Sequence, residues 1–149
     1  MDRRSVTESD LLDLLSPPER ELFWRLAPSD QRHSLAVMRY LRRRGVDDRV
    51  LLRAALVHDV GKASAPIHIW QRVVHVLARA WAPGIAAWLA RSDDGWRHGF
   101  YALKHHERLG AEMLGQIGTE REVVHLVGRV VTVLDDRRRS LLDEADSSV

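Results

Sequence analysis

Apolar residues recur at helical spacing along almost the whole chain, and strand-type alternation is nearly absent. The helical pattern is broken where glycine and proline fall, most clearly at Gly45, at Pro83-Gly84 and at Gly118. With 149 residues, of which 45% are apolar, the chain has the length and composition of one compact domain. We therefore expect an all-α, single-domain helical bundle.

Capping residues and helix breakers predict where individual helices begin and end. An N-terminal helix should start with a capping box made by Ser16 and Glu19, with Pro17 at the first helical position. The further helices are expected from Ser29, as N-cap, to about Arg44; from Asp47 or Asp48 to Asp59; on either side of Pro83-Gly84; from about His98 to Ile117; from about Glu120 to Leu134; and from Arg139 to Ala145.

The chain contains no cysteine, which excludes disulfides, thiolate metal sites and cysteine nucleophiles. Any metal must therefore be held by nitrogen and oxygen ligands. The N-terminus lacks the apolar core of a signal peptide, and the uninterrupted apolar stretch from Ala80 to Ala90 is shorter than the ~20 residues of a spanning helix. We expect a cytoplasmic protein without a transmembrane segment.

Two other features allow more than one interpretation. The apolar stretch from Ile67 to Ala90 contains three tryptophans and predicts a buried helical hairpin, with docking to a membrane surface as the alternative. The basic runs Arg42–Arg44 and Arg137–Arg139 are interpreted as solvated helix ends, where cations favour the C-terminal end of the dipole. A patch for nucleic acid or anionic lipid is the alternative for both runs.

Helical spacing separates inward-facing from outward-facing histidines, because residues three or four apart share a face. His33, His58, Asp59 and His106 lie in line with apolar residues of their helices and should point into the core. A buried aspartate is costly unless it is paired or bound to a metal, so this set predicts a metal site. The histidines with polar or loop neighbours, expected to face solvent or at most to support the site, are His68, His75, His98, His105 and His125.

The stretch His58-Asp59-Val60-Gly61-Lys62 carries the most chemical information. Adjacent residues on a helix point about 100° apart, so His58 and Asp59 can grip a metal that lies between their directions. Gly61 would let the chain turn and leave space beside the metal, and Lys62 can reach a phosphate oxygen as a point charge. A helix end capped by glycine and lysine would account for Gly61 and Lys62 but not for the inward pair.

This stretch closely resembles the core motif of the HD superfamily of metal-dependent phosphohydrolases, in its His-Asp-x-Gly-Lys form. Three further segments resemble other family motifs: residues 30–35, the helix of the first histidine; residues 106–112, a His-x-x-x-Gly-Ala-Glu helix; and residues 142–146, a last helix with an Ala-Asp pair. The resemblance covers the chain from about Asp30 onward. It implies a helical bundle of the HD-domain type at residues 29–149, preceded by an N-terminal helical segment at residues 1–28.

The resemblance implies a divalent metal bound by His33, His58, Asp59 and Asp146. Two other aspartates, Asp135 and Asp136, compete with Asp146 for the last position; the alanine before Asp146 favours it. With imidazole and carboxylate ligands alone, Mn, Fe, Mg, Ni, Co and Zn all remain candidates.

The expected activity is hydrolysis of a small phosphate ester of the nucleotide class. The catalytic residues would be Asp59, which helps to hold the attacking water, Lys62, which neutralises charge on the phosphoryl group, and His106, which orients the water or protonates the leaving oxygen. Nucleic acid is not excluded as a substrate.

One departure from the family pattern keeps other functions open. Members that bind two metals usually carry a further histidine after the glycine-containing helix, and residues 127–132 contain none. The Gly-Tyr-Pro signature of cyclic-di-GMP phosphodiesterases is absent as well. The sequence is therefore compatible with a site for one metal ion or with a degenerate site. The alternatives are a regulatory module that binds metal or nucleotide without turnover, and a peripheral membrane or interaction protein.

Overall fold

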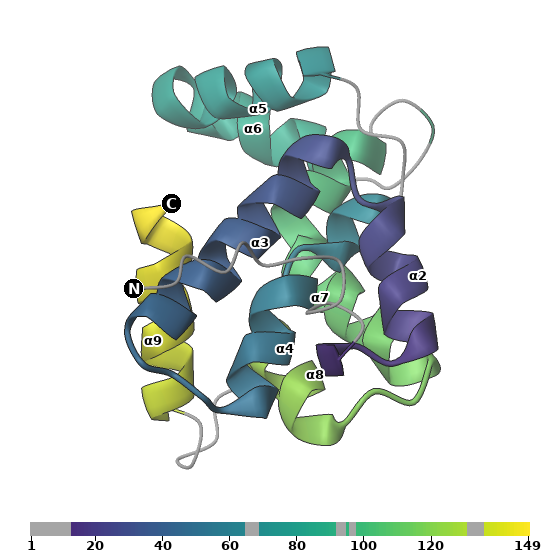
Figure 1. Cartoon of the computed structure of the whole chain (residues 1–149). Coiled ribbons are helices and arrows are strands. Elements are labelled where there is room, and N and C mark those ends of the chain that lie inside the picture. Colours follow the sequence, from purple (N-terminus) through teal and green to yellow (C-terminus); the bar gives the residue numbers. More distant parts are fainter. Residues whose placement is uncertain (1–12, 65–68, 92–94, 96–97, 131–135) are drawn as a thin grey trace.

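The computed structural model describes residues 13–64, 69–91, 95, 98–130 and 136–149, and within these ranges it contains helices and no strand (Figure 1). The predicted all-α fold class is confirmed. The elements are α2 (Pro17–Arg25), α3 (Pro28–Arg43), α4 (Arg49–Val57), the 3-10 helix η1 (Val60–Ser64), α5 (Ile69–Trp81), α6 (Pro83–Leu89), α7 (His98–Gln116), α8 (Arg121–Val127) and α9 (Asp136–Ser148).

The predicted capping box at the start of α2 also ties this helix to the rest of the fold. One carboxylate oxygen of Glu19 accepts a hydrogen bond from the Ser16 backbone N–H at 2.9 Å, and the other accepts one from Arg53 of α4 at 2.7 Å. Burial alone would raise the pKa of Glu19, but the Ser16 hydrogen bond and the Arg53 guanidinium hold it below its ordinary value. The fully buried carboxylate therefore stays charged and links α2 to α4.

Several helix boundaries differ from the prediction. Pro28 occupies the first turn of α3, so Ser29 lies inside the helix and does not cap it. The helix predicted over residues 120–134 ends at Val127, because Arg129 adopts a left-handed φ of 55°. Helix α9 extends beyond both of its predicted ends. Of the two predicted caps for α4, Asp48 is the one that accepts from the first backbone N–H groups.

The hydrophobic core lies between α2, α3, α4, α8, α9 and the C-terminal half of α7. Helix α2 contributes to this core together with the later helices, so the described part of the N-terminal segment packs as part of the same unit. The largest fully buried apolar side chains of this core are Phe23, Val37, Met38, Leu41, Leu51, Leu56, Val57, Val60, Leu114 and Leu126.

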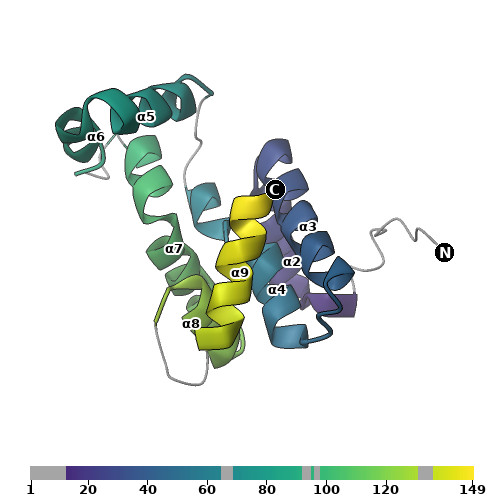
Figure 2. The same cartoon turned by 90° about the vertical axis from the view of Figure 1, so that its left-hand side faces the viewer.

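Helices α5 and α6 form a hairpin at one end of the molecule, beyond the N-terminal end of α7 and away from the main core (Figures 1 and 2). The prediction that this hairpin is buried is wrong. Trp81 is 86% exposed, and Val76, Leu77, Ile85 and Trp88 are exposed as well. Apolar residues occur on more than one face of the hairpin, whereas α7 packs against only part of it. Among the described residues, no helix combines the length and apolar character needed to cross a bilayer.

The second basic run lies at the start of α9 and not at a C-terminal helix end, so that prediction is also wrong. Arg138 forms ion pairs with Asp48 at 2.6 Å and with Glu122 at 2.8 Å, and Arg139 pairs with Asp143 at 2.8 Å. These acidic partners offset the unfavourable position of a cation at a helix N-terminus. The pairs of Arg138 join α9 to the start of α4 and to α8.

The 3-10 helix η1 packs backbone to backbone against α7. A Cβ atom placed on Gly61 would lie 1.8 Å from the carbonyl oxygen of His106 and 2.6 Å from the backbone nitrogen of Gly110. A Cβ on Gly110 would in turn lie 3.2 Å from the Gly61 nitrogen. Gly61 therefore leaves space for α7, and this close approach requires a residue without a side chain.

We expect Gly61→Ala to destabilise the protein by about 3 kcal/mol or more, because the methyl group forces η1 and α7 apart. Gly115→Ala is the matched control, since Gly115 lies in the same helix α7 and a Cβ there meets open space. The control should raise the free energy of unfolding by roughly 0.5 kcal/mol through helix propensity. Urea denaturation followed by circular dichroism measures both; similar values for the two variants would show that the close contact does not exist.

Candidate functional site

Three side chains that lie far apart in the sequence converge at one place. His33 of α3, His58 at the C-terminal end of α4 and Asp146 of α9 each offer one nitrogen or oxygen atom, and these atoms lie within 4.8 Å of one another. The Nε2 atom of His33 is 2.7 Å from Oδ1 of Asp146, and Nε2 of His58 is 3.2 Å from the same oxygen. Helices α3 and α9 pack side by side, and this packing brings the first and last members together.

The orientation of His58 makes this cluster suitable for a cation. Its Nδ1–H donates to the carbonyl oxygen of Ala55 at 2.8 Å, because a carbonyl can only accept. The lone pair of Nε2 then faces a carboxylate oxygen of Asp146 at 3.2 Å and one of Asp59 at 3.6 Å. A lone pair and two anionic oxygens repel one another unless a proton or a metal ion lies between them. The donor set therefore fits a divalent metal bound through nitrogen and oxygen.

Asp59 lies beside this cluster, with only 2% of its surface exposed. Its Oδ2 accepts a hydrogen bond from Lys62 Nζ at 2.7 Å, and its Oδ1 is 3.4 Å from Nε2 of His106. Lys62 also lies 3.8 Å from Oδ1 of Asp30 in the first turn of α3. Asp59 thus contacts His58, Lys62 and His106 at the same time.

The charges of these neighbours control the protonation of the carboxylates. Hydrogen bonds from His33 and His58 hold the pKa of Asp146 well below its ordinary value. Burial alone would raise the pKa of Asp59, but the positive charges of His58 and Lys62 outweigh it and lower the pKa. Burial would likewise lower the pKa of His58, but the hydrogen bond to Asp146 and the charge of Asp59 raise it. Without a metal, these carboxylates therefore favour a proton on His58, and a metal ion that binds there has to displace this proton.

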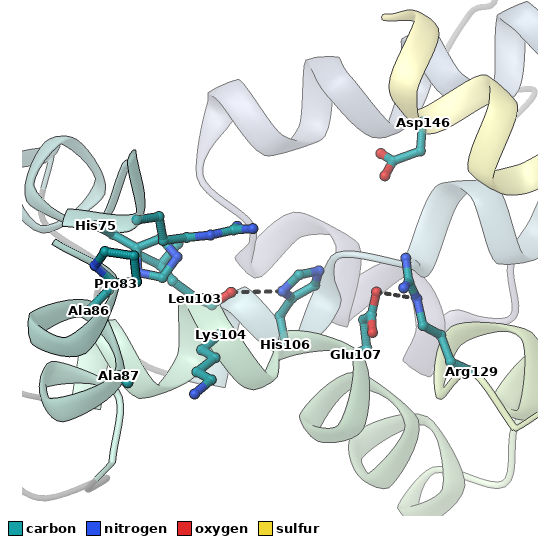
Figure 3. A pocket seen from close by; sticks show the side chains of 11 residues that line it. His75, Pro83, Ala86, Ala87, Leu103, Lys104, His106, Glu107, Arg129 and Asp146 are labelled. Carbon is teal, nitrogen blue, oxygen red and sulfur yellow. Dashed lines mark hydrogen bonds and ion pairs between the residues drawn. The ribbon is translucent and has the colours of Figure 1, made fainter. Parts of the chain in front are cut away.

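His106 lies on α7 beside Asp59. It follows a kink in α7 at His105, whose φ of −111° and ψ of 15° are not helical. The Nδ1–H of His106 donates to the carbonyl oxygen of Leu103 at 3.0 Å (Figure 3). Its Nε2 lies 3.4 Å from Oδ1 of Asp59, so Nε2 is the ring atom that faces the buried carboxylate.

A cavity of about 550 Å³ opens next to the cluster, within the size range of ligand pockets. Figure 3 shows Asp146 on one side of it and His106 and Glu107 on another. Glu107 forms an ion pair of 2.6 Å with Arg129. The charged and titratable side chains that line this cavity include His75, Arg79, Lys104, His106, Arg129 and Asp146.

The rivals of Asp146 do not join the cluster in the described part of the chain. Asp135 lies outside the described residues. Asp136 is exposed at the start of α9, ten residues before Asp146, which corresponds to about 15 Å along a helix. The geometry therefore favours Asp146 among the two aspartates that can be compared.

Sequence reasoning missed three residues near the site. His75 is predicted to face solvent or at most to support the site; it is buried and lines the cavity, because α5 packs its His75 face toward α7. Gln71, four residues earlier, is buried on the same face, but both side chains are polar, so the spacing of apolar residues gives no signal for this face. Asp30 shares a face with His33 three residues later, and this spacing could have indicated its position near the site. Arg129 follows no helical pattern, because it lies in the left-handed turn after α8.

Comparison with known protein families shows that the model of the HD domain matches residues 31–147. The match begins in the first turn of α3 and ends one residue after Asp146, so it includes every residue of the cluster. No curated protein and no solved structure matches the chain.

We expect the metal-free protein to release protons when Mn²⁺ or Zn²⁺ is added, because His58 must lose its proton to bind and its pKa is raised. The sign follows from this competition: as the pH falls through the raised pKa, the apparent affinity should fall by roughly tenfold per pH unit for each proton displaced. Calorimetry in two buffers of different ionisation enthalpy counts the protons; equal heats in both buffers would contradict the expectation.

Asp146→Asn should weaken metal binding by about tenfold or more, since it removes an anionic oxygen from the cluster. Asp136→Asn is the matched control on the same helix, and it should leave the affinity unchanged.

Proposed function

Because the chain belongs to the HD domain family, we propose that it is a metal-dependent phosphohydrolase or phosphodiesterase that acts on a nucleotide or a related phosphate ester. One observation carries the proposal: two imidazoles and a carboxylate converge within 4.8 Å beside the buried Asp59–Lys62 ion pair, at the edge of a cavity of ligand size.

The proposed metal ligands are His33, His58 and Asp146, with Asp59 as the fourth. HD domains typically bind divalent metals. A divalent metal held by these groups would supply Lewis acidity toward a phosphoryl oxygen and toward water. Asp59 qualifies as a ligand because its Oδ2 lies on the His58 side, 3.6 Å from Nε2. Nitrogen and oxygen donors of this kind leave Mn, Fe, Mg, Ni, Co and Zn as candidates.

Lys62 is held in position to neutralise charge on a phosphoryl group. Its ammonium is anchored by Asp59 at 2.7 Å and lies 3.8 Å from Asp30. Because both carboxylates belong to the protein, the cation is oriented before a substrate binds, and no reorganisation is needed as charge develops in the transition state. Asp59 therefore has a second role, since it positions Lys62.

His106 is the proposed proton donor to the leaving oxygen. Its Nδ1 is occupied by the Leu103 carbonyl, so Nε2 is the atom that exchanges a proton. Asp59, 3.4 Å from Nε2, orients the ring. The ring also lines the cavity, where the leaving group has to lie.

We expect the wild-type protein with added Mn²⁺ to hydrolyse bis-p-nitrophenyl phosphate, and Asp59→Ala to reduce the rate by about a hundredfold or more, since it removes a ligand and the anchor of Lys62. His106→Gln should lower kcat and leave metal binding intact, whereas His125→Gln on α8, away from the cavity, should change neither. A wild-type protein that binds metal but hydrolyses no ester in a broad screen would exclude the hydrolase and favour the regulatory module.

A second candidate function is docking to a membrane surface through the α5–α6 hairpin. The observation that favours it is the exposed apolar face with Leu77, Trp81, Ile85 and Trp88, since tryptophan and aliphatic residues partition into the interface of a bilayer. Arg79 lies exposed on the same hairpin and can contact anionic headgroups.

For this second function, vesicles that contain anionic lipid should co-sediment with the protein at low salt and less so at about 0.5 M salt, because screening weakens electrostatic attraction. Trp81→Ser should reduce the bound fraction several-fold, whereas Trp24→Ser, at an exposed tryptophan of α2, should not. Absence of co-sedimentation at low salt would exclude this function.

A further inference from the structure

The cavity beside the proposed metal centre contains positive charge that its own acidic groups do not neutralise. Arg129 is paired with Glu107 at 2.6 Å, and Asp146 is engaged by His33 and His58. Arg79 and Lys104 also line the cavity, and neither has an ion pair within 4.0 Å among the described residues. These two cations are therefore available to an anion that enters the cavity.

A buried histidine lies on the same wall. His75 is 9% exposed, and its Nδ1 is buried without a hydrogen-bond partner among the described residues. Because this atom has almost no accessible surface, the ring can contact a ligand in the cavity only through Nε2. Burial lowers the pKa of His75, and the charges of Arg79, His106 and Lys104 lower it further. The ring is thus a neutral hydrogen-bonding group in a positive electrostatic field.

Two structural features bring these groups together. His75 and Arg79 are four residues apart on α5 and share a face. Lys104 and His106 are two residues apart on α7, where a regular helix would direct them about 200° apart. The non-helical conformation at His105, between them, allows both to line one cavity. The cationic wall is therefore continuous with the side of the cavity that carries His106.

We propose that His75, Arg79 and Lys104 form a subsite for a second phosphate group of the substrate, so that the preferred substrate is a nucleotide carrying two phosphate groups. This inference rests on the proposed function, because it assumes that the reacting phosphate lies at the metal centre. The guanidinium of Arg79 supplies paired N–H donors that match phosphate oxygens, Lys104 supplies a point charge, and His75 supplies a hydrogen bond from a buried position.

The test compares three probes that differ in their number of phosphate groups. AMP has one, whereas ADP and adenosine 3′,5′-bisphosphate each have a second at a different position. Binding is measured by calorimetry with the protein as purified and without free metal ion. The wild type should bind at least one of the two-phosphate probes about tenfold more tightly than AMP.

Arg79→Ala and Lys104→Ala should each remove most of that preference and leave the affinity for AMP within about twofold, because the subsite contacts only the second phosphate. Lys104→Arg keeps the charge and should retain the preference. Arg43→Ala is the matched control, since it removes an exposed cation from the end of α3, outside the cavity, and should have no effect.

The outcomes separate this inference from the proposed function. If neither two-phosphate probe binds more tightly than AMP, or if the preference survives in both alanine variants, the subsite is wrong even when bis-p-nitrophenyl phosphate is hydrolysed. If the variants remove the preference but the wild type hydrolyses no ester, the subsite stands and the hydrolase does not.

Discussion

The backbone of Gly61 lies against the carbonyl group of His106 and the N–H of Gly110, so closely that no side chain fits between them. The rest of the site depends on this contact. Because η1 follows His58 and Asp59 directly, its approach to α7 brings Asp59 within 3.4 Å of His106. The same approach sets the C-terminal half of α7 against the core and leaves its N-terminal half, before the kink, to carry the α5–α6 hairpin. A glycine in the motif is thus required by packing, and the contact between Asp59 and His106 is a consequence.

The carboxylates in and near the site are held among positively charged or protonatable side chains. Glu19 is paired with Arg53 of α4, and Asp146 of α9 is contacted by His33 and His58. Asp59 is surrounded by three groups that can be positive, which lowers its pKa despite its burial. Removing one partner would leave an uncompensated charge, whereas the intact sets hold donor atoms at defined positions. The same ion pairs therefore fix the side chains of the site and join the helices around it.

The α5–α6 hairpin has one side toward the cavity and another side exposed to solvent. It stands at the end of the bundle (Figure 2), and it supplies His75 and Arg79 to the cavity while its other side remains apolar and exposed. The hairpin thus contributes to the cavity from outside the main core. Helix α7 connects the two regions, since its kinked segment at His105 separates the residues that face the hairpin from those that face η1.

Local sequence determined the helical class, the Asp48 cap and the capping box at Ser16, because these depend on residues within one or two turns of each other. Helical spacing also identified His33, His58, Asp59 and His106 as inward-facing, and the alanine before Asp146 favoured that aspartate over its rivals. Spacing could not show that Lys62 is shared with Asp30, that Arg138 joins α9 to α4, or that His75 is buried. Each of these depends on which helix packs against which, and a periodic pattern on one helix carries no information about its neighbour. The cavity is the clearest case, because its walls come from α5, α6, α7, α9 and the turn at Arg129, and only their tertiary arrangement brings those side chains to one place.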